Sequence, residues 1–149
     1  MRAVVQRVSR ASVVVDERVV GRIGAGLLVL VGVESGDGPA DIEYLASKIA
    51  EARVFPDEHG RMNRSVRDVG GAVLVVSQFT LLGDLRKGRR PAFDAAARPD
   101  TARASYESLI TQMKTSGLPV EAGVFQADMR VELINEGPVT ILLDSRRLF

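Results

Sequence analysis

The sequence predicts an α+β fold: a curved, barrel-like, largely antiparallel or mixed β-sheet with two packed helices. Strand patterns open and close the chain, and only two helical patterns lie between them. The regular alternation of strand and helix that is typical of a doubly wound parallel sheet is missing. With 149 residues, 46% of them hydrophobic, and no linker or low-complexity tract, we expect one domain over residues 1–149.

The N-terminal third is predicted to form strands. Apolar and polar residues alternate from Ala3 to Val8, and short strand patterns follow at Ser12–Val15 and Val19–Ile23. Leu27–Val33 is a nearly continuous apolar run bounded by glycines, which is typical of a strand that is buried on both faces.

Two helices are predicted from apolar residues at spacings of three and four. The first begins near Pro39, which suits a first helical position, and the second begins at about Pro99 and ends at Gly117. Their apolar faces consist of Ile42, Leu45, Ala46, Ile49 and Ala50, and of Ala102, Tyr106, Leu109, Ile110 and Met113. Further strands are expected at Ala72–Gln78, near Val120, at Met129–Ile134 and at Val139–Leu143.

Composition excludes several classes of site. The chain has no cysteine, and its one histidine, His59, lies in a polar turn where it would be a poor catalytic base. Neither a Walker P-loop nor a dinucleotide-binding glycine pattern is present, so we expect no metal and no cofactor. No apolar run approaches the ~18 residues of a membrane span, and the first residues do not resemble a signal peptide. We therefore expect a soluble cytoplasmic protein.

Polar residues follow or interrupt two apolar strand patterns. Ser77, Gln78 and Thr80 come at the end of one, and Asn135 with Gly137–Pro138 separates two others. Polar groups buried there without partners would cost a few kcal/mol each, so both segments are candidates for a site. Free backbone N–H groups at a strand end can stabilise an oxyanion, and Gly137–Pro138 is a candidate for a cis bond. From these residues alone, ordinary strand ends remain the alternative.

A basic loop, residues 86–90, contains Arg86, Lys87, Arg89 and Arg90. The net charge of +1 gives no global attraction for nucleic acid, so any such role is local. The loop is either a clamp for backbone phosphates or a solvated surface segment.

The two polar segments resemble a known family. Ser77–Leu81 and Asn135–Thr140 are similar to the two signature motifs of D-aminoacyl-tRNA deacylases, and the resemblance runs over essentially the whole chain. Glu136 stands where Asp is common, and the basic loop is richer in Arg than expected. Other matching segments include Gln6–Val8, Gly24–Leu30, Arg53–Phe55, Met62–Asn63, Arg90–Pro91 with Phe93, Gly123–Phe125 and Ala127–Met129.

The resemblance implies hydrolysis of the ester that joins a D-amino acid to the 3′ end of tRNA, and removal of glycine mischarged on tRNA. It assigns the catalytic site to Ser77, Gln78, Phe79 and Thr80, with backbone N–H groups around Phe79 and Thr80 near the scissile carbonyl. Two mechanisms stay open. Thr80 could be a nucleophile, or the ribose 2′-hydroxyl and a water could act with the protein supplying orientation and charge stabilisation, which we favour because no base accompanies Thr80.

The resemblance also implies a homodimer in which a cis Gly137–Pro138 peptide reaches into the partner's pocket. There its carbonyls would accept the substrate's α-amino group and exclude an L side chain, with Arg7 holding the dipeptide and Phe125 and Met129 as pocket walls. The expected partners are the aminoacylated 3′ end of tRNA and a second copy of the chain, with no membrane. Two alternatives are a tRNA 3′-end binder without turnover and a small-molecule esterase or amidase.

Overall fold

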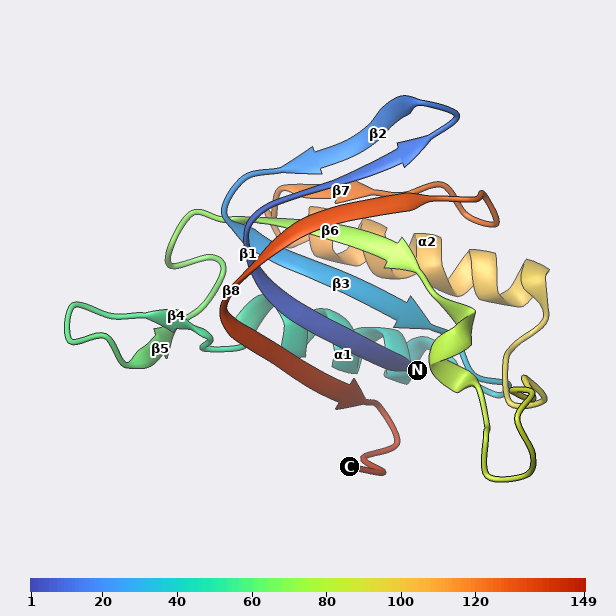
Figure 1. Cartoon of the computed structure of the whole chain (residues 1–149). Coiled ribbons are helices and arrows are strands. Elements are labelled where there is room, and N and C mark those ends of the chain that lie inside the picture. The colour runs from blue at the N-terminus through green and yellow to red at the C-terminus, as the bar shows by residue number, and fades with distance from the viewer.

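The computed structural model describes residues 1–149 and confirms the α+β class. A six-stranded mixed sheet has the order β2-β1-β3-β6-β7, and β8 pairs with the other edge of β1 (Figure 1). A separate hairpin, β4–β5, projects from one side of the molecule (Figure 1). The strands are β1 (Arg2–Val15), β2 (Arg18–Ile23), β3 (Gly26–Gly32), β4 (Phe55–Pro56), β5 (Met62–Arg64), β6 (Ala72–Ser77), β7 (Val120–Ala122) and β8 (Arg130–Asp144).

The long strand β1 gives the sheet its nearly closed, barrel-like curvature. Its first half lies between β3 and the second half of β8, with Arg2 opposite both Gly32 and Asp144. Its second half lies between β2 and the first half of β8. One bent strand thus belongs to both halves of the sheet.

Two helices, α1 (Pro39–Glu51) and α2 (Pro99–Thr115), pack on one face of the sheet (Figure 1). Each connects a pair of parallel strands, α1 between β3 and β6 and α2 between β6 and β7, as parallel pairing requires a long crossover. The apolar stripes of both helices are buried against β3 and β6 in one core cluster. The helix prediction is confirmed: both helices begin at the predicted prolines, and α2 ends at Thr115, two residues before Gly117.

The structure differs from the sequence prediction in four places. The patterns at 3–8 and 12–15 form one strand, and so do those at 129–134 and 139–143, which are the two halves of β8. The β4–β5 hairpin was not predicted because its strands have only two and three residues. A single 3₁₀ turn, η1 (Phe79–Leu82), follows β6 directly. No helix is long and apolar enough to cross a membrane.

Candidate active site

A cavity of about 790 Å³ lies between the end of β6, the start of α2 and the segment that leads into β8. Ser77, Gln78 and Phe79 form one side of it, and Phe125 and Met129 belong to another. Thirteen of its 18 lining residues are hydrophobic, so a flat apolar group would bury well there. The remaining lining residues are Val31, Val33, Val76, Phe93, Ala96, Ala97, Arg98, Pro99, Ala102, Tyr106, Gln126, Ala127 and Val131.

The polar end of the cavity is the turn η1. The N–H of Gln78 donates to the carbonyl of Val31 at 2.7 Å, which keeps the start of the turn against β3. The N–H groups of Phe79 and Thr80 come next, and as the first donors of a helical turn they have no acceptor within it. The Gln78 side-chain amide donates to the Thr80 hydroxyl. Two adjacent backbone donors are therefore available at the cavity edge.

The aromatic wall of the cavity is held by α2. The Phe125 ring has the Arg103 guanidinium 4.7 Å from its centroid and the Tyr106 ring 5.9 Å away. Tyr106 in turn donates its hydroxyl to the carbonyl of Val75 at 2.8 Å. The family resemblance assigned Phe125 and Met129 to pocket walls, and both line this cavity, whereas the sequence pattern placed Tyr106 only on a core-facing helix stripe. It missed Arg98 and Gln126, whose types carry no signal for a pocket.

No side chain in the cavity lining is suited to act as a general base. The titratable lining residues are Arg98 and Tyr106. Burial raises the pKa of Tyr106 well above its usual range, and its hydroxyl is already donated to Val75. His59 lies in the β4–β5 turn with its side chain 72% exposed, outside the lining. Apart from Arg98 and Tyr106, the polar groups that the lining does offer are a hydroxyl, amides and backbone groups.

The second motif lies at an irregular point within β8. The Gly137–Pro138 peptide bond is cis, and Gly137 has a φ of +126°, a conformation that favours glycine. The Arg7 guanidinium donates to the carbonyl of Glu136 at 3.1 Å and to that of Val54 at 2.5 Å. Both residues of the dipeptide are exposed, so this backbone is available to a partner.

Within one chain, the second motif does not line the cavity. Arg7, beside Gly137, is level with Leu27 of β3 and therefore with Val73 of β6. Reaching Ser77 from there takes about 13 Å along β6 and about 14 Å across three strand spacings, or roughly 20 Å in all along the sheet. The structure therefore brings Ser77–Phe79, Phe125 and Met129 together, but it places Arg7, Gly137 and Pro138 elsewhere.

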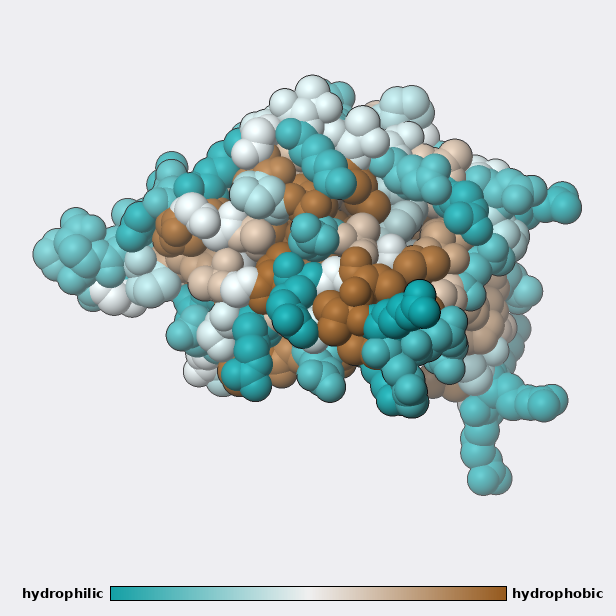
Figure 2. Space-filling model, turned by 90° about the horizontal axis from the view of Figure 1, so that it is seen from above, coloured by the Kyte–Doolittle hydropathy of each residue, from teal (hydrophilic) through white to brown (hydrophobic).

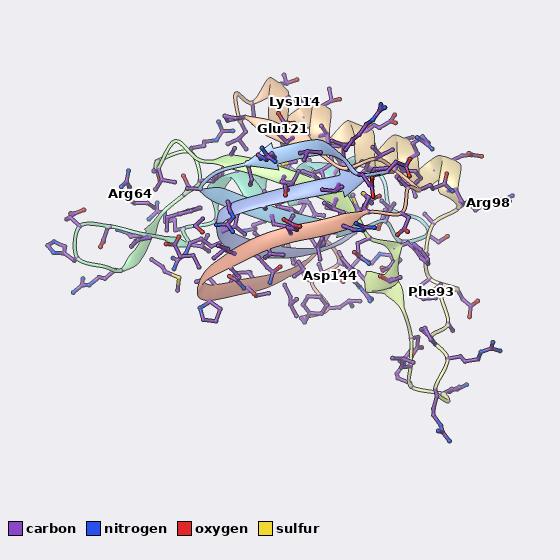
Figure 3. All side chains as sticks on the ribbon, turned by 45° about the horizontal axis from the view of Figure 1, so that its top comes forward. Arg64, Phe93, Arg98, Lys114, Glu121 and Asp144 are labelled. Carbon is purple, nitrogen blue, oxygen red and sulfur yellow. The ribbon has the colours of Figure 1, made fainter.

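The basic loop follows η1 and extends away from the body of the molecule (Figure 1). It connects Phe79 and Phe93, which both line the cavity. Phe79 packs edge-on against Phe93 with centroids 4.9 Å apart, across the base of the loop. Figure 3 shows Phe93 and Arg98 at one end of the molecule and Arg64 at the opposite one. Asp84 pairs with Arg86 at 2.6 Å, and this hydrogen-bonded pair lowers the pKa of Asp84 to about 2. Lys87, Arg89 and Arg90 are exposed and make no ion pair.

An aromatic pocket that ends in backbone donors and lacks a side-chain base is the site of a binder or of a hydrolase for activated esters. Comparison with known proteins identifies the family. A family model described as D-Tyr-tRNA(Tyr) deacylase matches residues 4–144. The chain is 62% identical to a protein of Koribacter versatilis and 63% identical to one of Anaeromyxobacter dehalogenans, both named D-aminoacyl-tRNA deacylase, with all of each chain covered. The chain belongs to the D-Tyr-tRNA(Tyr) deacylase family.

Two solved structures share this fold. A protein described as c-Myc DNA unwinding element binding protein is 41% identical, with a TM-score of 0.92 over 97% of this chain and 98% of that one. A probable eukaryotic D-amino acid tRNA deacylase is 17% identical, with a TM-score of 0.80 over 95% and 97% of the two chains, and shows the shared fold.

Proposed function

We propose that this chain hydrolyses the ester bond of D-aminoacyl-tRNA and releases the D-amino acid and tRNA. The observation that carries the proposal is the pair of unpaired N–H groups on Phe79 and Thr80 at the edge of an aromatic cavity. Membership of the deacylase family supports it. Because aminoacyl-tRNA is made and used in the cytoplasm, we place the activity there.

The terminal adenosine of tRNA suits the cavity. Its base would lie against Phe125 and Met129, since bases of single-stranded RNA ends stack on aromatic and apolar side chains. The ester on its ribose would then reach Gln78 and the two backbone donors. The basic loop would neutralise phosphates of the preceding nucleotides through its three cations without an ion pair, Lys87, Arg89 and Arg90.

The reaction consumes one water. Its oxygen attacks the carbonyl carbon, the N–H groups of Phe79 and Thr80 stabilise the oxyanion, and the bond from that carbon to the ribose 3′-oxygen breaks. We propose that the neighbouring 2′-hydroxyl relays the proton from water to the departing 3′-oxygen, because the cavity lining offers no base. The Thr80 hydroxyl, already an acceptor for Gln78, positions substrate and is not the nucleophile.

Chiral selection would come from a second copy of the chain. The Gly137–Pro138 carbonyls of that copy would accept the substrate's α-ammonium group and leave no space for an L side chain, while glycine would pass. The separation of about 20 Å along the sheet between the motifs within one chain supports this arrangement. So do the exposed hydrophobic residues Ile134, Ile141 and Leu142, which lie on β8 on both sides of the motif. Figure 2 shows exposed hydrophobic residues gathered in the middle of the upper face among hydrophilic ones.

The test compares D-tyrosyl-tRNA with L-tyrosyl-tRNA under multiple turnover. We expect rapid hydrolysis of the D form and of glycine on a non-cognate tRNA, while the L form survives. Equal rates for both enantiomers would refute the chiral filter, and binding of one equivalent without turnover would instead identify a tRNA 3′-end binder. For the mechanism, Thr80→Ala should retain activity, whereas tRNA ending in 2′-deoxyadenosine should react at least about a hundredfold more slowly. The reverse result would make Thr80 the nucleophile.

A further inference from the structure

The turn η1 needs support from outside itself. It has four residues, and its ladder consists of short-range bonds such as Leu81 N–H to the Gln78 carbonyl at 3.2 Å and Gly83 N–H to the Thr80 carbonyl at 3.0 Å. These bonds define its shape but not its direction relative to the sheet. Oxyanion donors act only when they are aimed at the reacting oxygen, so the residues that orient this turn affect the reaction rate.

One support lies beneath the turn. Gly32 is the last residue of β3, and a Cβ atom at this position would lie 3.0 Å from the Gln78 carbonyl oxygen and 3.3 Å from Leu81 Cβ. Both distances are shorter than most Cβ contacts in proteins. The backbone of Gly32 does not have a positive φ, so its conformation alone would admit any residue. Because the turn packs directly on the strand, a Cβ here would push the turn away by a few tenths of an ångström, which glycine avoids.

The other support holds the end of the turn. Arg2, the cross-strand partner of Gly32, donates from Nη1 to the carbonyl of Leu81 at 3.5 Å. It also donates from Nε to the Asp144 carboxylate at 3.0 Å. The Asp144 side chain is fully buried and accepts a second bond, from the Arg146 N–H at 2.7 Å. Arg2 is thereby fixed between the end of β8 and the end of η1.

We propose that Gly32 and Arg2, the latter held by Asp144, are positioning residues for hydrolysis, which aim the Phe79 and Thr80 N–H groups at the substrate carbonyl. Gly32 sets the height of the turn above the sheet, and Arg2 sets its tilt. Neither residue lines the cavity, so substrate affinity does not depend on them. The inference rests on the proposed function, because it assigns a role in the same site.

Gly32→Ala and Gly32→Val test whether Gly32 sets the height of η1 above the sheet. A displacement of about 1 Å in a catalytic group costs about a hundredfold in rate, so we expect kcat for D-tyrosyl-tRNA to fall about tenfold for Ala and about a hundredfold for Val. KM should stay within about twofold, because only transition-state contacts are lost. Gly24→Ala and Gly24→Val are the matched controls, since a Cβ there would meet nothing within 4 Å. Equal kcat values for the Gly32 and Gly24 variants would overturn the proposal.

Arg2 provides a second test that needs no added volume. Arg2→Ala should lower kcat about tenfold with KM unchanged, and Arg2→Lys should restore part of it by keeping a cation beside Asp144. An unchanged kcat, or a loss confined to KM, would refute the role of Arg2.

A readout independent of activity separates this inference from the proposed function. In NMR spectra, the amide signals of Phe79 and Thr80 should shift in the Gly32 and Arg2 variants and stay in place in the Gly24 variants. If the wild-type chain fails to hydrolyse D-tyrosyl-tRNA, the proposed function fails, while these shifts still report whether the turn is held as described. Unmoved signals would overturn the inference whatever the activity.

Discussion

A site shared between two chains makes a quantitative prediction for mixed dimers. Gln78→Ala removes the amide that bonds to the Thr80 hydroxyl beside the cavity, and Gly137→Ala damages the second motif. At Gly137 a Cβ would lie 2.8 Å from Val139 Cγ2 and 3.0 Å from Arg7 Nη2, at a φ that L residues rarely adopt. Such strain costs about 1–3 kcal/mol, and relieving it by a shift of about 1 Å costs roughly a hundredfold in rate. Gly137→Ala should therefore be nearly inactive. Gln78→Ala should be nearly inactive as well, because it removes the cavity side chain that the ester is proposed to reach.

The heterodimer of these two variants should regain activity. If each site combines the Gln78 of one chain with the Gly137 of the other, one of the two sites in the heterodimer is intact. An isolated, differently tagged heterodimer should then show about half of the wild-type kcat, as expected for a two-fold symmetric pair. The assay is multiple-turnover hydrolysis of D-tyrosyl-tRNA, with dimer mass checked by light scattering.

The reciprocal heterodimer is the control. One chain carries both substitutions and the other is wild type, so every shared site has one damaged motif and activity should be nearly absent. If both motifs instead served a site within one chain, the outcomes would be exchanged, with this dimer about half active and the other inactive. That exchange would refute our interpretation that the roughly 20 Å between the motifs along the sheet reflects a site shared between two chains.

Three further predictions concern the surroundings of the site. Lys87, Arg89 and Arg90 are the cations of the basic loop without an ion pair, and replacing them by Ala should reduce the slope of log K for tRNA binding against log salt concentration by about 2. Replacing the exposed Arg18 and Arg22 of β2 should leave this slope unchanged. Equal slopes for all variants would favour a merely solvated loop. NMR should find the carboxyl of Asp84 ionised until the pH falls to about 2, and Arg86→Ala should raise its pKa part of the way to the ordinary value, because the side-chain hydrogen bonds that favour the charged form are lost while the backbone N–H of residue 86 still donates to Asp84. Tyr106→Phe should cost about 1 kcal/mol of stability by calorimetry, because the Val75 carbonyl keeps its bond from Gly123, and should leave the pH profile of kcat unaltered; the loss of a rise in kcat with increasing pH would instead make Tyr106 a general base.

Local patterns in the sequence predicted the helices and most strand positions because each element buries its apolar residues at the period of its own geometry. The continuous apolar run at Leu27–Val33 is buried as a central strand, and the apolar residues from Ile42 to Ala50 are buried as one stripe of a helix. The same patterns could not show that β8 is one strand, since its two halves are aligned by pairing with β1 at Asn135 and at Thr140, on either side of an unpaired segment. Nor could they show η1, which is too short to leave a period.

The site was predictable to the extent that its residues have no structural reason to be polar. Ser77 and Gln78 stood out because a hydroxyl and an amide follow a buried strand, and the structure places both at the cavity. Arg98 and Tyr106 could not be found in this way, because an Arg before a helix and a Tyr on its buried stripe are ordinary. Gly32 was hidden for another reason. Its role arises from contact with residues almost 50 positions away in the chain, which only the tertiary structure brings together.

A site of backbone donors has a consequence for selectivity. Backbone N–H groups contact the carbonyl, which every aminoacyl ester shares, so they cannot tell one amino acid from another. Discrimination then depends on what the site excludes, and exclusion requires a wall that does not yield. In our proposal this wall is the Gly137–Pro138 turn of the second copy, and hydrogen bonds within its own chain hold it in place. Arg7 donates to the Glu136 carbonyl, and the Asn135 amide both accepts from the Val139 N–H at 3.1 Å and donates to Thr140 at 3.0 Å. The donors of Phe79 and Thr80 are supported with similar density by Gly32 and Arg2. The side-chain contacts around both motifs therefore fix the backbone of η1 and of the Gly137–Pro138 turn. A fixed backbone suits an enzyme whose substrate, as proposed here, carries the reactive groups itself.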